Sequence, residues 1–100
     1  MKNIKTVNIS SVEYKIILKH GLKDDKLGEC DGITDTDEKT IELDDNLNGA
    51  AFKKAFLHEI IECMNEEYSL RLHHTQICAL EGAIYDTFCR NNLNGLFRRK

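Results

Sequence analysis

The sequence contains neither proline nor tryptophan among its 100 residues. It also has no long apolar run, and its opening MKNIKTVNIS lacks the apolar centre of a signal peptide. A membrane-spanning helix needs about 20 predominantly apolar residues, so we expect no membrane partner and a cytoplasmic location. The length predicts a single domain over residues 1–96, followed by a basic tail at 97–100.

The cysteines contain no C-x-x-C pair, which argues against a metal ribbon or a redox motif. They stand far apart in the chain, as Cys30, Cys63, Cys78 and Cys89. In a reducing cytoplasm we expect them to be thiols that mostly fill the core.

Acidic residues gather between positions 24 and 45, where ten carboxylates stand against two lysines. Asp31, Asp35 and Asp37 lack the central glycine and late glutamate of an EF-hand loop, so this stretch predicts a solvated acidic loop rather than a calcium site. The net charge of −3 and the absence of a basic helix argue against a nucleic-acid partner, including a helix-turn-helix regulator.

Alternating apolar residues predict strands at 7–9, 12–18 and 39–44. The Ser10–Ser11 pair between the first two is typical of a tight turn and predicts a hairpin. Residues 20–39 are rich in glycine, aspartate and lysine and predict a loop.

Helical spacing of apolar residues begins after Asn48, a suitable N-cap, and extends from Gly49 to about Tyr68. A second helix is predicted from about residue 74 or 75 to Asn91. We therefore predict an α+β fold in which a small antiparallel sheet, made of the hairpin and an edge strand, packs on two antiparallel helices.

The stretch FLHEIIEC, residues 56–63, carries a histidine and a glutamate four residues apart. On a helix His58 and Glu62 stand one above the other, so an imidazole nitrogen and a carboxylate oxygen can reach one zinc ion. Glu59 lies 100° around the helix, where H-E-x-x-H peptidases hold their general base. The string alone is a weak signal, because glutamate is common on helices.

A catalytic zinc usually takes a third protein ligand, and the second helix offers a stripe of candidates, His74, Cys78, Glu81 and Tyr85. His74 could complete the set, with Glu81 as a rival ligand or as a partner that orients a histidine. Cys78 could bind zinc, Tyr85 could stabilise an oxyanion, and His73 is an alternative ligand. Each also has an ordinary interpretation, as a helix-boundary histidine, a hydrogen-bonded carboxylate or a core residue.

Taken together, these segments resemble the small zincin-like proteins encoded by bacterial phages and prophages. The resemblance implies a zincin-like core in which His58, Glu62 and His74 bind Zn²⁺ and Glu59 is the catalytic glutamate, with Glu62 in place of a second histidine. It covers most of the chain, through VEYKIIL (12–18), LGECD (27–31), KTIELDDNL (39–47), AFLHEIIECMN (55–65) and LRLHHTQICALEGAIYDTFCRNN (70–92).

Two functions remain open from the sequence. The first is metal-assisted amide hydrolysis of a peptide substrate in the bacterial host cell. The second is a catalytically inactive phage accessory protein that binds a host protein, as an inhibitor or adaptor, through the acidic stretch at 24–45.

Overall fold

The computed structural model describes residues 5–24, 28–91 and 93. Strands come first and helices follow, with a five-residue π-helical turn, η1, after the last helix. The elements are β1 (Lys5–Ile9), β2 (Val12–Lys19), β3 (Lys23–Asp24), β4 (Gly28–Glu29), β5 (Gly32–Asp35), β6 (Thr40–Asp44), α1 (Gly49–Glu67), α2 (His74–Ile84) and η1 (Tyr85–Cys89). The predicted α+β class is confirmed, whereas the basic tail at 97–100 lies outside the described residues.

The strands of the main sheet lie in the order β1-β2-β6-β5, and β3 and β4 pair separately within the described residues. The predicted hairpin of β1 and β2 is present, and Ser10 and Ser11 both have positive φ, as the favoured two-residue hairpin turns require. The sheet is mixed rather than purely antiparallel, because β6 runs parallel to β2, with Ile16 opposite Ile41.

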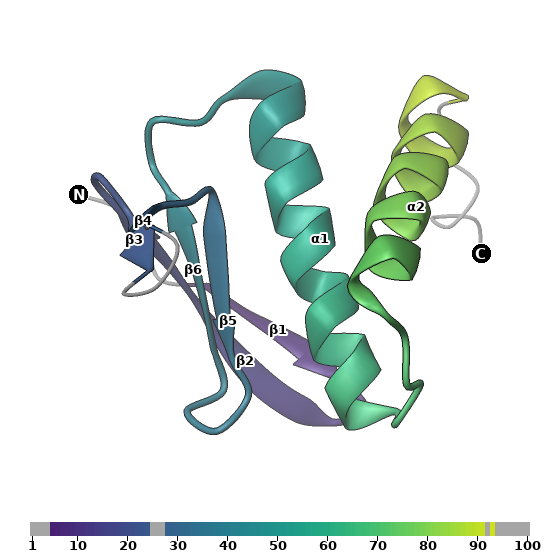
Figure 1. Cartoon of the computed structure of the whole chain (residues 1–100), viewed down its shortest axis with the longest axis horizontal. Coiled ribbons are helices and arrows are strands. Elements are labelled where there is room, and N and C mark those ends of the chain that lie inside the picture. The colour runs from purple at the N-terminus through teal and green to yellow at the C-terminus, as the bar shows by residue number, and fades with distance from the viewer. Residues whose placement is uncertain (1–4, 25–27, 92, 94–100) are drawn as a thin grey trace.

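A parallel pair needs a long crossover between its strands, and residues 20–39, predicted to be loop, supply it. This segment also contains the short strand β5, which turns back antiparallel onto β6 and becomes an edge of the sheet. The prediction of an edge strand at 39–44 is therefore wrong, because β6 is an inner strand between β2 and β5. Figure 1 shows that β5 is an edge strand that lies close to α1.

The core lies between one face of the sheet and α1. Tyr14, Ile41, Leu43 and Cys63 are fully buried, and α1 adds a face of partly buried residues that contains Phe52, Phe56, Ile60 and Met64. The predicted apolar face of the helix is thus largely confirmed, although Tyr68, just past its end, is 54% exposed.

The four cysteines differ in burial, and none of them is in a disulfide; Cys30 is partly buried. Cys63 fills the core as predicted, and burial raises the pKa of its thiol to about 11, so it stays protonated at neutral pH. Cys78 and Cys89 are exposed, and the expectation of core-filling thiols is wrong for both. The reason is that α2 and the turn after it have solvent on their outer side.

The two helices are antiparallel, as predicted, and α1 lies between the sheet and α2 (Figure 1). The sheet packs on α1, and α2 packs on the side of α1 that faces away from the sheet. Among the described helices, none combines the length and the apolar composition needed to cross a bilayer.

Candidate metal centre

The candidate ligands come together where α2 begins beside the middle of α1. His58 Nε2 lies 3.3 Å from Glu62 Oε2, one helical turn away on α1. The His74 ring, at the start of α2, meets the His58 ring edge-on with 5.5 Å between ring centroids. One ligand atom from each of these three residues lies within 4.8 Å of the other two. We call this group the His58–Glu62–His74 cluster.

The cluster fits the donor set of a zinc site. Two imidazoles and one carboxylate are common zinc ligands, and donors on one tetrahedral ion with bonds of about 2.0–2.2 Å lie about 3.4 Å apart. The 3.3 Å between His58 and Glu62 already matches this spacing. The wider separations, up to 4.8 Å, have to shorten by up to about 1.4 Å, which rotation of the exposed His74 side chain can provide.

Glu81 lies behind His58. Its Oε1 is 2.9 Å from His58 Nδ1, the ring nitrogen opposite to the one that faces Glu62. Metal-binding histidines commonly donate this second N–H to a carboxylate, which fixes the tautomer and orients the ring. Of the two roles that the sequence leaves open for Glu81, ligand or orienting partner, the geometry favours the second.

Glu59 is buried, at 8% exposure, and it points toward the edge strand β5. Its Oε1 accepts a 2.7 Å hydrogen bond from Thr34 Oγ1. The side chain also packs on Gly32, where an added Cβ would lie 2.8 Å from Glu59 Cγ, so only glycine fits without displacement. Burial raises the pKa of the Glu59 carboxyl, and the Thr34 hydrogen bond and the nearby His58 partly oppose this shift.

A cleft of about 770 Å³ connects Glu59 with the cluster. It lies between β5, the second half of α1 and the loop that leads into α2. Its walls are formed by Cys30, Gly32, Ile33, Thr34, Thr36, His58, Glu59, Glu62, Asn65, Glu66, Ser69, Arg71 and His74. Three carboxylates and two imidazoles in this set favour a cation over an anion at its centre.

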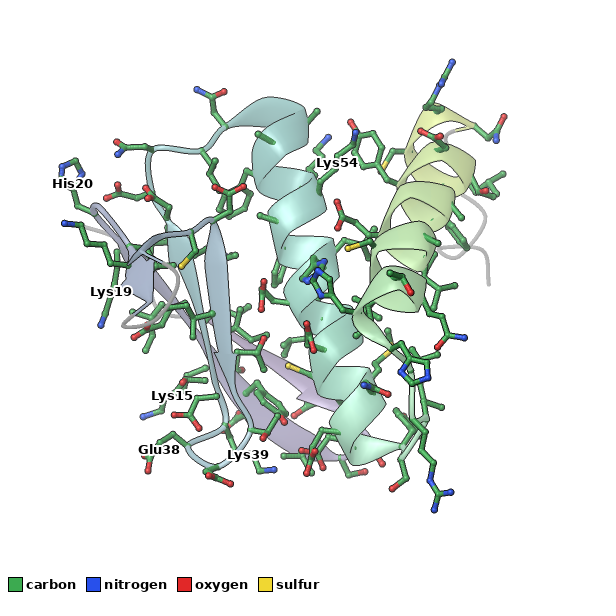
Figure 2. The ribbon with its side chains drawn as sticks, viewed as in Figure 1. Lys15, Lys19, His20, Glu38, Lys39 and Lys54 are labelled. Atoms are coloured by element: carbon green, nitrogen blue, oxygen red, sulfur yellow. The ribbon has the colours of Figure 1, made fainter. Side chains whose placement is uncertain are left out.

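The remaining candidates, Tyr85, His73 and Cys78, are not part of the cluster. Tyr85 is absent from the residues that line the cleft, and Lys54 Nζ lies 5.1 Å from its ring centroid, reaching across from α1 toward α2 (Figure 2). His73 is the exposed N-cap of α2, and its backbone N–H donates to Gln76 Oε1 at 2.8 Å. Cys78 Sγ lies 3.5 Å from His74 Nε2 but is not part of the cluster.

A second polar network fixes the wall of the cleft. Glu67, the last residue of α1, accepts hydrogen bonds at Oε2 from the Tyr14 hydroxyl at 2.6 Å and from Lys39 Nζ at 2.7 Å. The Lys39 bond, followed by the Tyr14 bond, holds the pKa of Glu67 below its usual value. Figure 2 shows Lys39 in the β5–β6 turn, at the end of the molecule where α1 terminates. The network therefore holds this turn, and β5 with it, against α1.

Two carboxylates of the acidic stretch at 24–45 accept hydrogen bonds from nearby backbone N–H groups. Asp35 Oδ1 accepts the backbone N–H groups of Asp37 and Glu38 at 2.9 and 3.0 Å. Asp44 bonds in the same way to the backbone of Asn46 and Leu22. These contacts give the carboxylates a local role in the loop, and binding of a host protein by this stretch stays a prediction.

The contribution of β5 to the site was missed from the sequence. Gly32 and Thr34 are two residues apart and so share one face of a strand, which is the face that contacts Glu59. A short period-two signal exists in GITD, but four residues with one large apolar side chain do not distinguish a strand from a loop.

Compared with known proteins, the chain matches no family model, no curated protein and no solved structure. The zincin-like resemblance therefore rests on the residues of this chain alone, and it stays a prediction.

Proposed function

We propose that this protein is a zinc-binding domain of the phage zincin-like type, with His58, Glu62 and His74 as the metal ligands. The observation that carries the proposal is the His58–Glu62–His74 cluster, whose donor atoms lie within 4.8 Å of one another. The carboxylate of Glu81 on the opposite nitrogen of His58 supports it, because that contact leaves Nε2 available for a metal.

The reaction proposed for this site is hydrolysis of a peptide amide. Bound zinc would supply a Lewis acid and make a coordinated water more acidic. Glu59 would accept a proton as general base. Burial raises its pKa, which makes it a stronger base than an ordinary surface glutamate, and Thr34 restricts its orientation.

The edge strand β5 would bind the peptide substrate. Within the described part of the chain, β5 pairs with β6 on one side and has no strand on the other, and it forms one wall of the cleft. An extended peptide can add to such an edge through backbone hydrogen bonds. This arrangement would bring a peptide bond alongside Glu59 and the cluster.

Glu62 limits how strong this activity would be. A carboxylate ligand in place of a second histidine adds negative charge at the metal, which weakens it as a Lewis acid and makes its water less acidic. We therefore expect metal binding to be the more robust property and amide hydrolysis to be slow.

Isothermal titration calorimetry with Zn²⁺ tests the ligand set, and the chain offers a matched pair of variants. His73 and His74 are adjacent and both exposed, but His74 alone belongs to the cluster. We expect His74→Ala to weaken zinc binding by at least about 100-fold, since losing a ligand costs more than losing an outer partner. His73→Ala should change the affinity by less than about threefold. Equal effects of the two substitutions would contradict the proposal.

A further inference from the structure

The helix α2 is weakly attached to the rest of the molecule. Among its eleven residues, all described, Ile77 alone is buried, while Leu80 is 38% exposed. Its packing partners are α1 and the turn that follows it. An isolated helix of about this length is marginal in water, so α2 depends on its contacts with α1 to stay in place.

Polar and ring contacts between the two helices meet at the metal centre. His58 of α1 meets Glu81 of α2 at 2.9 Å and the His74 ring at 5.5 Å between centroids. One turn further along, Lys54 lies over the Tyr85 ring. Of the residues in these contacts, His58, Glu81 and Tyr85 are partly exposed and His74 is exposed.

The candidate ligands are divided between the helices. His58 and Glu62 belong to α1, and His74 belongs to α2. An ion held by all three would link the helices directly, and Glu81 on α2 would strengthen the link through His58. A ligand that binds the docked arrangement and not the undocked one stabilises docking by mass action.

We infer that metal occupancy controls the docking of α2 onto α1. This inference rests on the proposed function, because it needs a metal at the cluster. The docked helix closes one side of the cleft with His74, so loss of the metal opens that side and exposes His58 and Glu62 to solvent. The metal would therefore stabilise the docked arrangement in which its three ligands meet.

Hydrogen–deuterium exchange on the full chain tests the inference, with samples in EDTA, in Zn²⁺ and in Mg²⁺. We expect Zn²⁺ to slow the exchange of α2 backbone amides at least about tenfold, while the amides of β2 and β6 change by less than about twofold. Mg²⁺, which prefers oxygen ligands and near-octahedral geometry, should have no such effect.

The variant His74→Ala separates this effect from general stabilisation. It removes the α2 ligand and keeps both ligands of α1, so its α2 amides should exchange at the same rate with and without Zn²⁺. His73→Ala alters the N-cap of α2, so its α2 amides should exchange faster than those of the wild type in EDTA, but Zn²⁺ should still slow them. The inference is wrong if α2 is already as protected as α1 in EDTA, or if zinc still protects α2 in His74→Ala.

Calorimetry on the same samples distinguishes the two proposals. Absence of zinc binding to the wild type overturns both the metal centre and the control of docking. Zinc binding at the cluster with unchanged exchange in α2 overturns the control of docking alone, and the metal centre stands.

Discussion

Substitution of Glu59 by glutamine should stabilise the folded protein and remove its proposed catalytic base. Glu59 is 8% exposed, and burial is the main cause of its raised pKa. Glutamine has the same shape, and its carbonyl oxygen can still accept the 2.7 Å hydrogen bond from Thr34. The substitution therefore removes a buried charge without removing a contact.

The expected gain in unfolding free energy at pH 7 is about 1 kcal/mol, within the usual range for a single stabilising substitution. For a domain of this size that corresponds to a rise of about 4–8 °C in Tm. The gain has a definite pH dependence. Because folding raises the pKa of Glu59, the wild-type carboxyl is neutral in both states below its unfolded pKa, and there the two proteins should be equally stable. The wild type should become less stable than Glu59→Gln as the pH rises from the unfolded pKa of Glu59 through its folded pKa.

Thermal unfolding of wild type and Glu59→Gln between pH 3.5 and pH 8 measures this difference. Glu66→Gln is the matched control, because Glu66 is an exposed carboxylate on the same helix and lines the same cleft. The control should change stability by less than about 0.5 kcal/mol. Peptide hydrolysis, where present, should fall about 10²–10⁴-fold in Glu59→Gln. A destabilised Glu59→Gln, or a gain that does not vary with pH, would show that the buried charge of Glu59 does not cost stability.

Three further predictions follow from the contacts around the cleft. Gly32→Ala places a methyl group 2.8 Å from Glu59 Cγ and should lower the unfolding free energy by about 1 kcal/mol in urea denaturation, with zinc affinity unchanged by calorimetry. Glu67→Gln should lower Tm at neutral pH. Because folding lowers the pKa of Glu67, the Tm difference between wild type and variant should disappear as the pH falls through the folded pKa of Glu67; a Tm difference that does not change with pH would contradict this. Cys78 lies outside the cluster, so the Co²⁺-loaded protein should show no thiolate charge-transfer absorption, and Cys78→Ser should leave its spectrum unchanged.

Much of the fold could be predicted because its signals are local. The Ser10–Ser11 turn, the alternation in β2 and β6 and the helical spacing of α1 all depend on neighbouring residues. The parallel pairing of β2 with β6 could not be predicted, because it depends on how residues 20–39 cross the sheet. That path is set by tertiary packing, and β5 within it is too short for its pattern to be distinctive.

The candidate site likewise has a part that local sequence predicts and a part that depends on tertiary packing. The i, i+4 spacing brings His58 and Glu62 together on any helix, and the antiparallel arrangement brings His74 to them. From the sequence, helical spacing predicts the side of α1 on which Glu59 lies. It does not predict that Glu59 is buried, because the burial depends on contacts with Gly32 and Thr34 on β5.

Tyr85 shows the opposite case. It shares a helical stripe with His74, but it lies about three turns further along, at the start of η1, beside Lys54 and away from the cleft. A shared stripe therefore does not bring two residues to the same site when they are this far apart along the helix axis.

The central claim is that His58, Glu62 and His74 hold one zinc ion. Anomalous diffraction from crystals of the zinc-loaded protein, recorded on both sides of the zinc absorption edge, tests it most directly. We expect one peak about 2.0–2.2 Å from His58 Nε2, a Glu62 carboxylate oxygen and a His74 ring nitrogen, with Glu81 on His58 Nδ1. A cluster without a peak, or a peak held by His73 or by other residues, would contradict it.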